Sequence, residues 1–108
     1  MANNATPQVA LDLLVLKTLE SGPNHGFGIT VAIQEGSEGL LRVEEGSLYP
    51  ALHRLEKNGL LSSDWKVTDN SRRARIYKLT AAGRKRLREA EETWRNLARG
   101  VQKVLRHA

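Results

Sequence analysis

The segment from Gly46 to Leu61 constrains the fold more than any other part of this sequence. Leu48, Leu52 and Leu55 recur at helical spacing and give the segment one apolar face, while tyrosine, histidine and cations occupy the opposite face. Gly59 follows at the position where a helix often ends in the left-handed conformation. The pattern predicts a short helix that lies on a hydrophobic body and presents polar side chains outward.

We predict that this helix runs from about Glu45 to Asn58. Ser47 is its expected N-terminal cap, because the hydroxyl can accept a hydrogen bond from an otherwise unpaired backbone N–H. Pro50 then falls in the first turn, where the missing N–H of proline costs little.

Two strand-like stretches follow this helix. Side chains alternate along residues 61–67 and again along residues 74–79, and residues 68–71 between them have the composition of a turn. Arg72 and Arg73 stand at the exit of that turn. The order helix, strand, basic turn, strand is that of a winged helix-turn-helix. We therefore predict a mainly α (α+β) fold with a basic hairpin as its wing.

The first third of the chain predicts two further helices, from Val9 to Leu19 and from about His25 to Glu35, separated by a turn. The first of them is apolar over most of its girth, so it is buried on more than one side. It lies either at the centre of the domain or under a second subunit. Residues 40–43 read as a short third strand or as a linker.

The last predicted helix begins near Thr80, a suitable cap, and runs to about Leu105. Its apolar residues follow a three-four spacing, which is a heptad seam and indicates pairing with another helix rather than packing back on its own domain. The residues expected at a dimer interface are Leu87, Ala90, Trp94, Leu97, Val101 and Val104 of this helix, with Leu11, Leu14 and Val15 of the first. The expected organisation is a tail at 1–8, a winged helix-turn-helix at 9–80 and a dimerisation helix at 81–108.

The net charge of +5 is unevenly distributed. Residues 1–40 carry one cation against four anions, residues 41–80 eight against five, and residues 81–108 eight against three. A basic second half indicates a polyanionic partner, although it is also compatible with a surface that only keeps the protein in solution.

Double-stranded DNA is the partner that this pattern favours, because the major groove admits one helix with an apolar back and a hydrogen-bonding front. The alternatives are an ordinary amphipathic helix and a hairpin whose charges are simply solvated. The residues expected to contact DNA are Ser47, Tyr49, His53, Arg54 and Lys57 of the helix and Arg72, Arg73 and Arg75 of the hairpin. A winged-helix module that binds protein without specific DNA binding is the competing interpretation.

Several other classes of function are disfavoured. The chain has no cysteine, its three histidines are scattered without metal-ligand spacing, and no catalytic dyad is recognisable, so we expect neither an enzyme nor a metal or other cofactor. RNA binding is disfavoured because we expect no exposed aromatic side chain on the hairpin. The sequence has no recognisable signal peptide or transmembrane segment, so we expect a cytoplasmic protein.

Four stretches carry a resemblance to a known family: residues 11–16, residues 22–29, the run from 46 to 61, and residues 77–83. Through these the chain resembles the PadR family of bacterial transcriptional regulators, in its short form with a single C-terminal helix. The Gly-Ser-Leu-Tyr-Pro-Ala-Leu run is the most specific of the motifs, and the resemblance covers most of the chain from Val9 to Arg86. Phe27 stands where the family often has tyrosine.

The resemblance implies a homodimeric regulator, usually a repressor, that binds a pseudo-palindromic operator. It implies that the C-terminal helix pairs with its mate and with the first helix of the partner. By matched position, Ser47, Tyr49 and Pro50 are expected at the start of the DNA-reading helix. Some members of the family respond to small aromatic effectors, and Trp94 is the residue here that could contact a flat ligand.

Overall fold

The computed structural model describes residues 6–67 and 71–107, so the predicted turn at Thr68–Asn70 and the first five residues lie outside the described part of the chain. Helices α1 (Gln8–Glu20), α2 (Gly26–Gly36) and α3 (Glu45–Lys57) form the body, and strands β2 (Leu61–Val67) and β3 (Arg73–Leu79) form the hairpin. The long helix α4 (Ala81–His107) follows. The predicted fold class and element order are confirmed.

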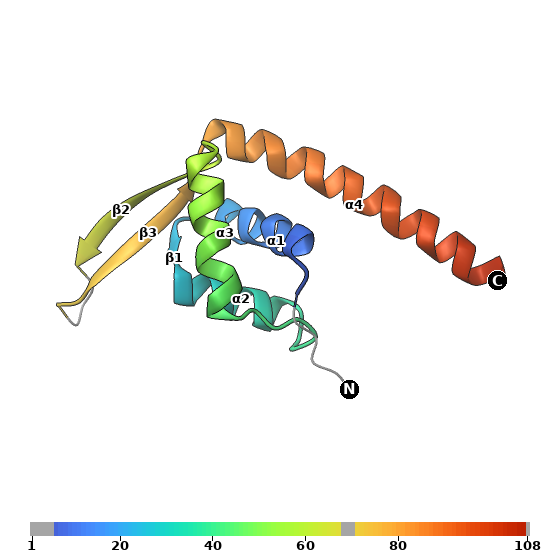
Figure 1. Ribbon diagram of the computed structural model, residues 1–108, viewed down its shortest axis with the longest axis horizontal. Helices are drawn as coiled ribbons and strands as arrows, with labels where there is room; N and C mark the ends of the chain where they lie inside the picture. The colour runs from blue at the N-terminus through green and yellow to red at the C-terminus, as the bar shows by residue number, and fades with distance from the viewer. Residues whose placement is uncertain (1–5, 68–70, 108) are drawn as a thin grey trace.

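Helix α1 lies at the centre of the body (Figure 1). It packs against α2, α3, β3 and α4, which is why nearly its whole girth is apolar. The apolar composition of α1 is therefore explained by its position at the centre of its own domain. The buried core consists of Leu11, Val15, Leu16, Leu19, Ile29, Ile33, Val43, Leu48, Ala51, Leu52, Leu55, Leu60, Leu61, Tyr77, Leu79 and Leu87.

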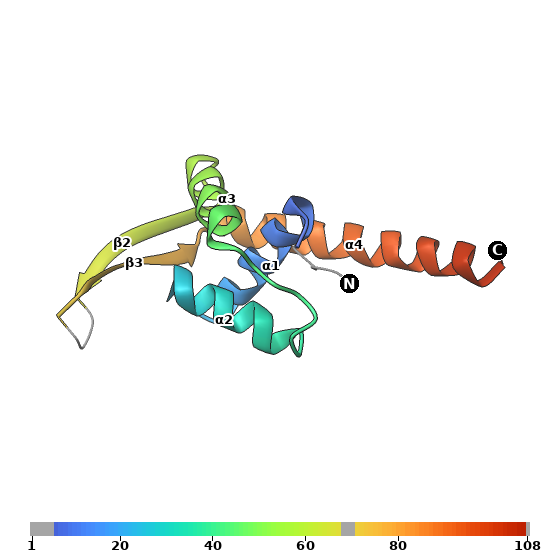
Figure 2. The same ribbon diagram turned by 60° about the horizontal axis from the view of Figure 1, so that its bottom comes forward.

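The hairpin and α4 project from opposite sides of this body, as Figures 1 and 2 both show. The molecule measures 56 × 33 × 21 Å along its principal axes. A helix of 27 residues is about 40 Å long, so α4 accounts for most of the longest dimension. Only the first turns of α4 pack on the body, and the remainder extends away from it.

The sheet has a third strand that sequence patterning missed. Strand β1 (Asn24–His25) pairs antiparallel with β3, giving the strand order β1-β3-β2. Two residues are too few to show periodicity. His25 also caps α2, because its Nδ1 accepts a hydrogen bond from the backbone N–H of Gly28 at 3.0 Å. The helix predicted to begin at His25 thus begins one residue later, and residues 40–43 form a linker in which only Arg42 makes an isolated bridge.

Helix α3 begins where it was predicted to begin, but its N-terminal cap differs from the prediction. The helix begins at Glu45, and the backbone N–H groups of Ser47 and Leu48 both donate to the carbonyl of Glu44. Ser47 is therefore the third residue of the helix rather than its cap, and Pro50 lies in the second turn. The prediction that Ser47 caps the helix is wrong, because the helix has already begun at Glu45, with Glu44 at the cap position.

The ends of α3 and α4 follow the sequence more closely. Gly59 has a φ of 78°, and the N–H groups of Gly59 and Leu60 donate to the carbonyls of Glu56 and Leu55, both at 2.9 Å. This is the expected left-handed termination of α3. Thr80 caps α4, because its hydroxyl accepts from the Gly83 N–H at 3.0 Å.

Thr6 and Gln8 fall within the tail expected at residues 1–8, and both take part in the described fold. Thr6 donates through its backbone N–H and its hydroxyl to the carbonyl of Arg42, at 3.3 and 2.8 Å. Gln8 is already the first residue of α1. This end of the chain is thus attached to the linker before α3.

Candidate nucleic-acid interface

Helix α3 has the two faces that its sequence predicts. Leu48, Leu52 and Leu55 are at most 4% exposed and fix the helix on the body. The opposite face leaves Ser47, Tyr49, Pro50, His53 and Lys57 exposed. The side of α3 that carries hydrogen-bonding groups is therefore open to a large partner.

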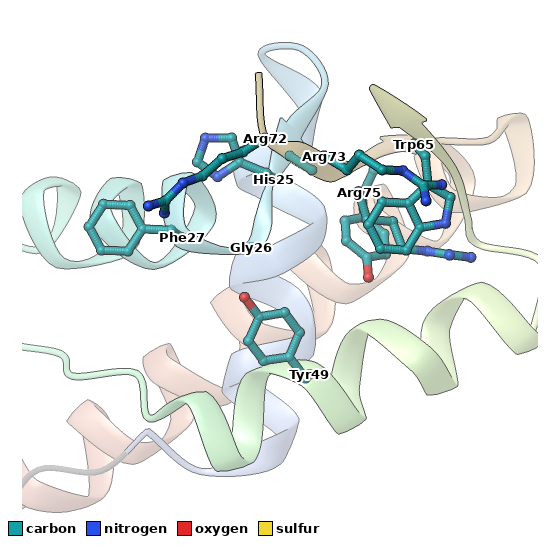
Figure 3. Close-up of a pocket in the computed structure, with 10 residues that line it drawn as sticks. His25, Gly26, Phe27, Tyr49, Trp65, Arg72, Arg73 and Arg75 are labelled. Carbon is teal, nitrogen blue, oxygen red and sulfur yellow. The ribbon is translucent and has the colours of Figure 1, made fainter. Parts of the chain in front are cut away.

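Tyr49 leans across the hollow beside α3 and points its hydroxyl toward Gly26, the first residue of α2 (Figure 3). A Cβ atom added at Gly26 would lie 2.6 Å from the Tyr49 hydroxyl and 2.8 Å from its ring. Gly26 is thus needed to leave room for this tyrosine, which still exposes 46% of its surface. Sequence reasoning did not single out this contact, because the two residues belong to different helices.

Arg54 does not extend outward in the way that the helical pattern suggested. Its guanidinium forms an ion pair with Asp12 of α1 at 2.5 Å, and both side chains are about one-third exposed (34% and 30%). In this position Arg54 connects α3 to the central helix α1. The pair links residues far apart in the sequence, so no local pattern could have revealed it.

Two of the three hairpin arginines that were expected to contact DNA are exposed. Arg72 and Arg73 are exposed, whereas Arg75 is half-buried and turned toward Ser63 and Glu56. The expectation that the hairpin has no exposed aromatic residue is wrong, because Trp65 is 54% exposed. In the structure Trp65 lies on the same face of β2 as the buried Leu61, but the hairpin projects beyond the body that would cover it.

A hollow of about 640 Å³ lies between the hairpin, the start of α3 and the start of α2. Figure 3 shows Phe27 and His25 on one side of it and Trp65 with Arg73 and Arg75 on the other. Its walls combine aromatic rings with guanidinium groups, a surface suited to an anionic polymer with apolar sugar edges. The lining residues are His25, Gly26, Phe27, Tyr49, Trp65, Arg72, Arg73, Ala74, Arg75 and Tyr77.

The apolar seam of α4 divides into two parts. Leu87 is 1% exposed and belongs to the core, and Ala90 is half-buried. From Trp94 onward the seam is open, with Trp94, Leu97, Val101 and Val104 exposing 48, 55, 47 and 68% of their surfaces. The described part of the same chain does not cover these four residues.

The residues of α1 that were expected at a dimer interface are mostly covered already. Leu11 and Val15 are at most 1% exposed within a single chain, so they serve the core. Leu14 is half-buried and keeps part of its surface accessible. Any surface that α1 offers to a partner is therefore narrower than the sequence suggested.

An ion pair between Lys17 and Glu91 joins α1 to α4. Lys17 lies 2.9 Å from Glu20 and 3.2 Å from Glu91 of α4. The hydrogen bond to Glu20, followed by that to Glu91, raises the pKa of Lys17, and the same bond to Lys17 lowers the pKa of Glu20. Burial raises the pKa of Tyr77, because the phenolate of this core residue on β3 is poorly solvated.

Among the described residues, no three histidine, aspartate or glutamate side chains lie close enough together to hold a metal ion. None of the described helices combines the length and apolar character that crossing a membrane requires.

Residues 15–89 match the model of the transcriptional regulator PadR-like family. The chain belongs to this family. PadR-like proteins are regulators that bind DNA, so the chain is a DNA-binding transcriptional regulator and not an enzyme. The family assignment made from the four sequence stretches is confirmed.

The chain is also similar to individual transcriptional regulators. The chain is 42% identical over 94 residues to a transcriptional regulator of Mycobacterium tuberculosis, covering 87% of this chain and 84% of that protein. A solved transcriptional regulator from Clostridium thermocellum is 28% identical with a TM-score of 0.81, over 89% of this chain and 93% of the other. A PadR family regulator from Eggerthella lenta is 34% identical with a TM-score of 0.77, over 89% and 81% respectively.

Proposed function

We propose that this PadR-like regulator acts as a homodimeric repressor on a pseudo-palindromic operator. The observation that carries the proposal is the pairing of an exposed reading face on α3, next to a cationic hairpin, with an uncovered apolar seam on a projecting α4. In a two-fold dimer, two such reading helices would meet successive major grooves roughly 34–36 Å apart.

In this proposal α3 enters the major groove with Ser47, Tyr49, His53 and Lys57 toward the DNA. The hairpin lies along the flanking backbone with Arg72 and Arg73. Arg54 reaches the DNA only if it leaves Asp12, so we assign it a smaller role than its position on the helix suggested. A repressor of this kind acts on chromosomal DNA, so we propose that the protein is cytoplasmic.

The dimer is proposed to form through Trp94, Leu97, Val101 and Val104 of α4, with Leu14 of the partner's α1 as a minor contributor. Exposed apolar residues at heptad spacing are stabilised by pairing with a second seam. Trp94 would then lie inside the interface, where two indoles could hold a small planar aromatic effector that releases the operator.

The test uses the unaltered protein and two labelled duplexes, the DNA upstream of its own gene and a scrambled duplex of equal length. We expect light scattering to give the mass of a dimer and the natural duplex to bind more tightly. Binding should weaken about a thousandfold or more between 50 and 200 mM salt if six or more phosphates are neutralised. Failure to bind either duplex would favour the protein-interaction module instead.

A further inference from the structure

Trp65 occupies an unusual position for an indole. It lies in the outer half of β2, directly opposite Arg75 on β3, and Arg73 follows on the same face two residues nearer the tip. Side chains alternate along a strand, so these three share the face that turns toward α3 (Figure 3). An aromatic ring left 54% exposed among arginines calls for an explanation.

Both guanidinium groups lie close to the indole. The Cζ atom of Arg73 is 4.9 Å from the ring centroid of Trp65, and that of Arg75 is 5.4 Å away. Both distances are within the ~6 Å range of cation–π attraction. Two cations beside one ring repel each other, so the arrangement is favourable only if one of the charges is compensated.

Arg75 is the compensated one. Its Nε donates to the Ser63 hydroxyl at 2.8 Å and its Nη2 lies 3.5 Å from the Glu56 carboxylate. The Ser63 hydroxyl donates in turn to the same carboxylate at 2.7 Å. Because Glu56 belongs to α3 and the other two to the hairpin, this bracket of Glu56, Ser63 and Arg75 connects the hairpin directly to the reading helix.

Arg73 has a different environment. It is exposed, and it forms no ion pair with any other residue that the structure describes. Its guanidinium lies over the face of Trp65. A charged group held on a flat ring loses less rotamer freedom on binding than a freely moving one, since part of its ordering has already occurred. The charge of Arg73 therefore remains available to bind an anion. It is held at a defined position, nearer the hairpin tip than the bracket.

We propose that Glu56, Ser63 and Arg75 fix the hairpin at a set angle to α3, and that Trp65 presents the Arg73 guanidinium to a phosphate beside the groove that α3 reads. This rests on the proposed function. Arg73 is the DNA contact in this arrangement, whereas Arg75, Glu56 and Trp65 are positioning residues.

The two arginines give a matched pair for a test, since they lie on one strand and carry the same charge. Operator binding by R73A and R75A is measured by fluorescence anisotropy over a series of salt concentrations. R73A should make the slope of log affinity against log salt shallower by about 0.9, the value for one lost phosphate contact. R75A should weaken binding while keeping the slope.

Trp65 is tested in the same assay. W65A should bind about two- to five-fold more weakly at every salt concentration, the size of an exposed cation–π contact, with the slope unchanged because no cation is removed. W65F, which keeps a ring, should recover most of the loss. Tight binding by W65A would overturn the role of Trp65, and an unchanged slope for R73A would overturn the phosphate contact.

The bracket is tested with E56A against D64A. Both variants remove one anion near the hairpin, but Asp64 lies on the opposite face of β2 and outside the bracket. Both should bind scrambled DNA somewhat more tightly, and only E56A should lose preference for the operator. If E56A and D64A prefer the operator over scrambled DNA to the same extent, the proposed role of the bracket is overturned, whereas the roles of Arg73 and Trp65 are not affected. If the unaltered protein itself shows no operator preference, the proposed function fails and this inference fails with it.

Discussion

Gly83 in the first turn of α4 offers a direct test of how the long helix is attached to the body. A Cβ added at Gly83 would lie 2.1 Å from the backbone oxygen of Leu60 and 3.1 Å from Cδ2 of Leu79. The oxygen of Leu60 already accepts a hydrogen bond from the Thr80 N–H at 3.2 Å, and the Thr80 hydroxyl donates to the Gly59 carbonyl at 2.7 Å. A backbone atom held in this way cannot rotate aside, so α4 itself would have to move.

The expected cost of Gly83→Ala follows from two opposing terms. Replacing a helical glycine by alanine stabilises a helix by at most about 1 kcal/mol. Forcing a methyl group into a filled contact costs typically about 1–3 kcal/mol, and here the neighbour is backbone rather than a flexible side chain, which favours the upper part of that range. We expect a net loss of about 1–2 kcal/mol, and each kcal/mol lowers the melting temperature by roughly 4–8 °C in a chain of this size.

Thermal unfolding followed by far-ultraviolet circular dichroism measures this loss. The matched control is Gly36→Ala at the end of α2, where an added Cβ meets nothing within 4 Å. That variant should melt at or slightly above the temperature of the unaltered protein. If Gly83→Ala is as stable as Gly36→Ala, the close approach of α4 to Leu60 does not hold the helix in place and the reasoning is refuted.

Three further outcomes are expected. Gly26→Ala should displace the Tyr49 ring and weaken operator binding several-fold, with little change in melting temperature, because the clash is with the end of a side chain; unchanged affinity would argue against a role for Tyr49. Leu97→Asp should convert the proposed dimer into a monomer in light scattering, with helix content unchanged in circular dichroism, since it places a charge in the exposed seam. In a Y49F background Tyr77 should titrate above about pH 10 in tyrosinate absorbance, because burial raises its pKa. The stability that this raised pKa contributes is complete below pH ~10 and is lost as pH rises through the folded pKa.

Much of the fold could be predicted from local pattern, and the reasons differ by element. Helix α3 has a strict leucine spacing and a glycine stop, so its identity and its end were predictable. Its cap was not predictable, because Ser47 has a residue type that suits a cap, whereas Glu44, which occupies the cap position, makes no capping hydrogen bond through its side chain. Strand β1 has two residues and is defined entirely by its pairing with β3.

The candidate interface was predictable only in outline. Residue type and helical position identified the exposed face of α3, but they could not show that Arg54 pairs with Asp12 across 42 positions of sequence. Alternation identified residues 61–67 as a strand. What it could not show is that the hairpin extends past the body, so that an inner face becomes an exposed one. Both differences arise from contacts between distant segments.

The burial of Leu87 has a consequence for how the protein is made. This residue of α4 completes a core centred on Leu11 and Val15 of α1, near the other end of the chain. During synthesis, which proceeds from the N-terminus at about 5–20 residues per second, that core stays open until the first turns of α4 have left the ribosome. The exposed face of α3 and the helix proposed to pair two copies therefore become stable at nearly the same time, which leaves little time for a folded single copy to bind DNA.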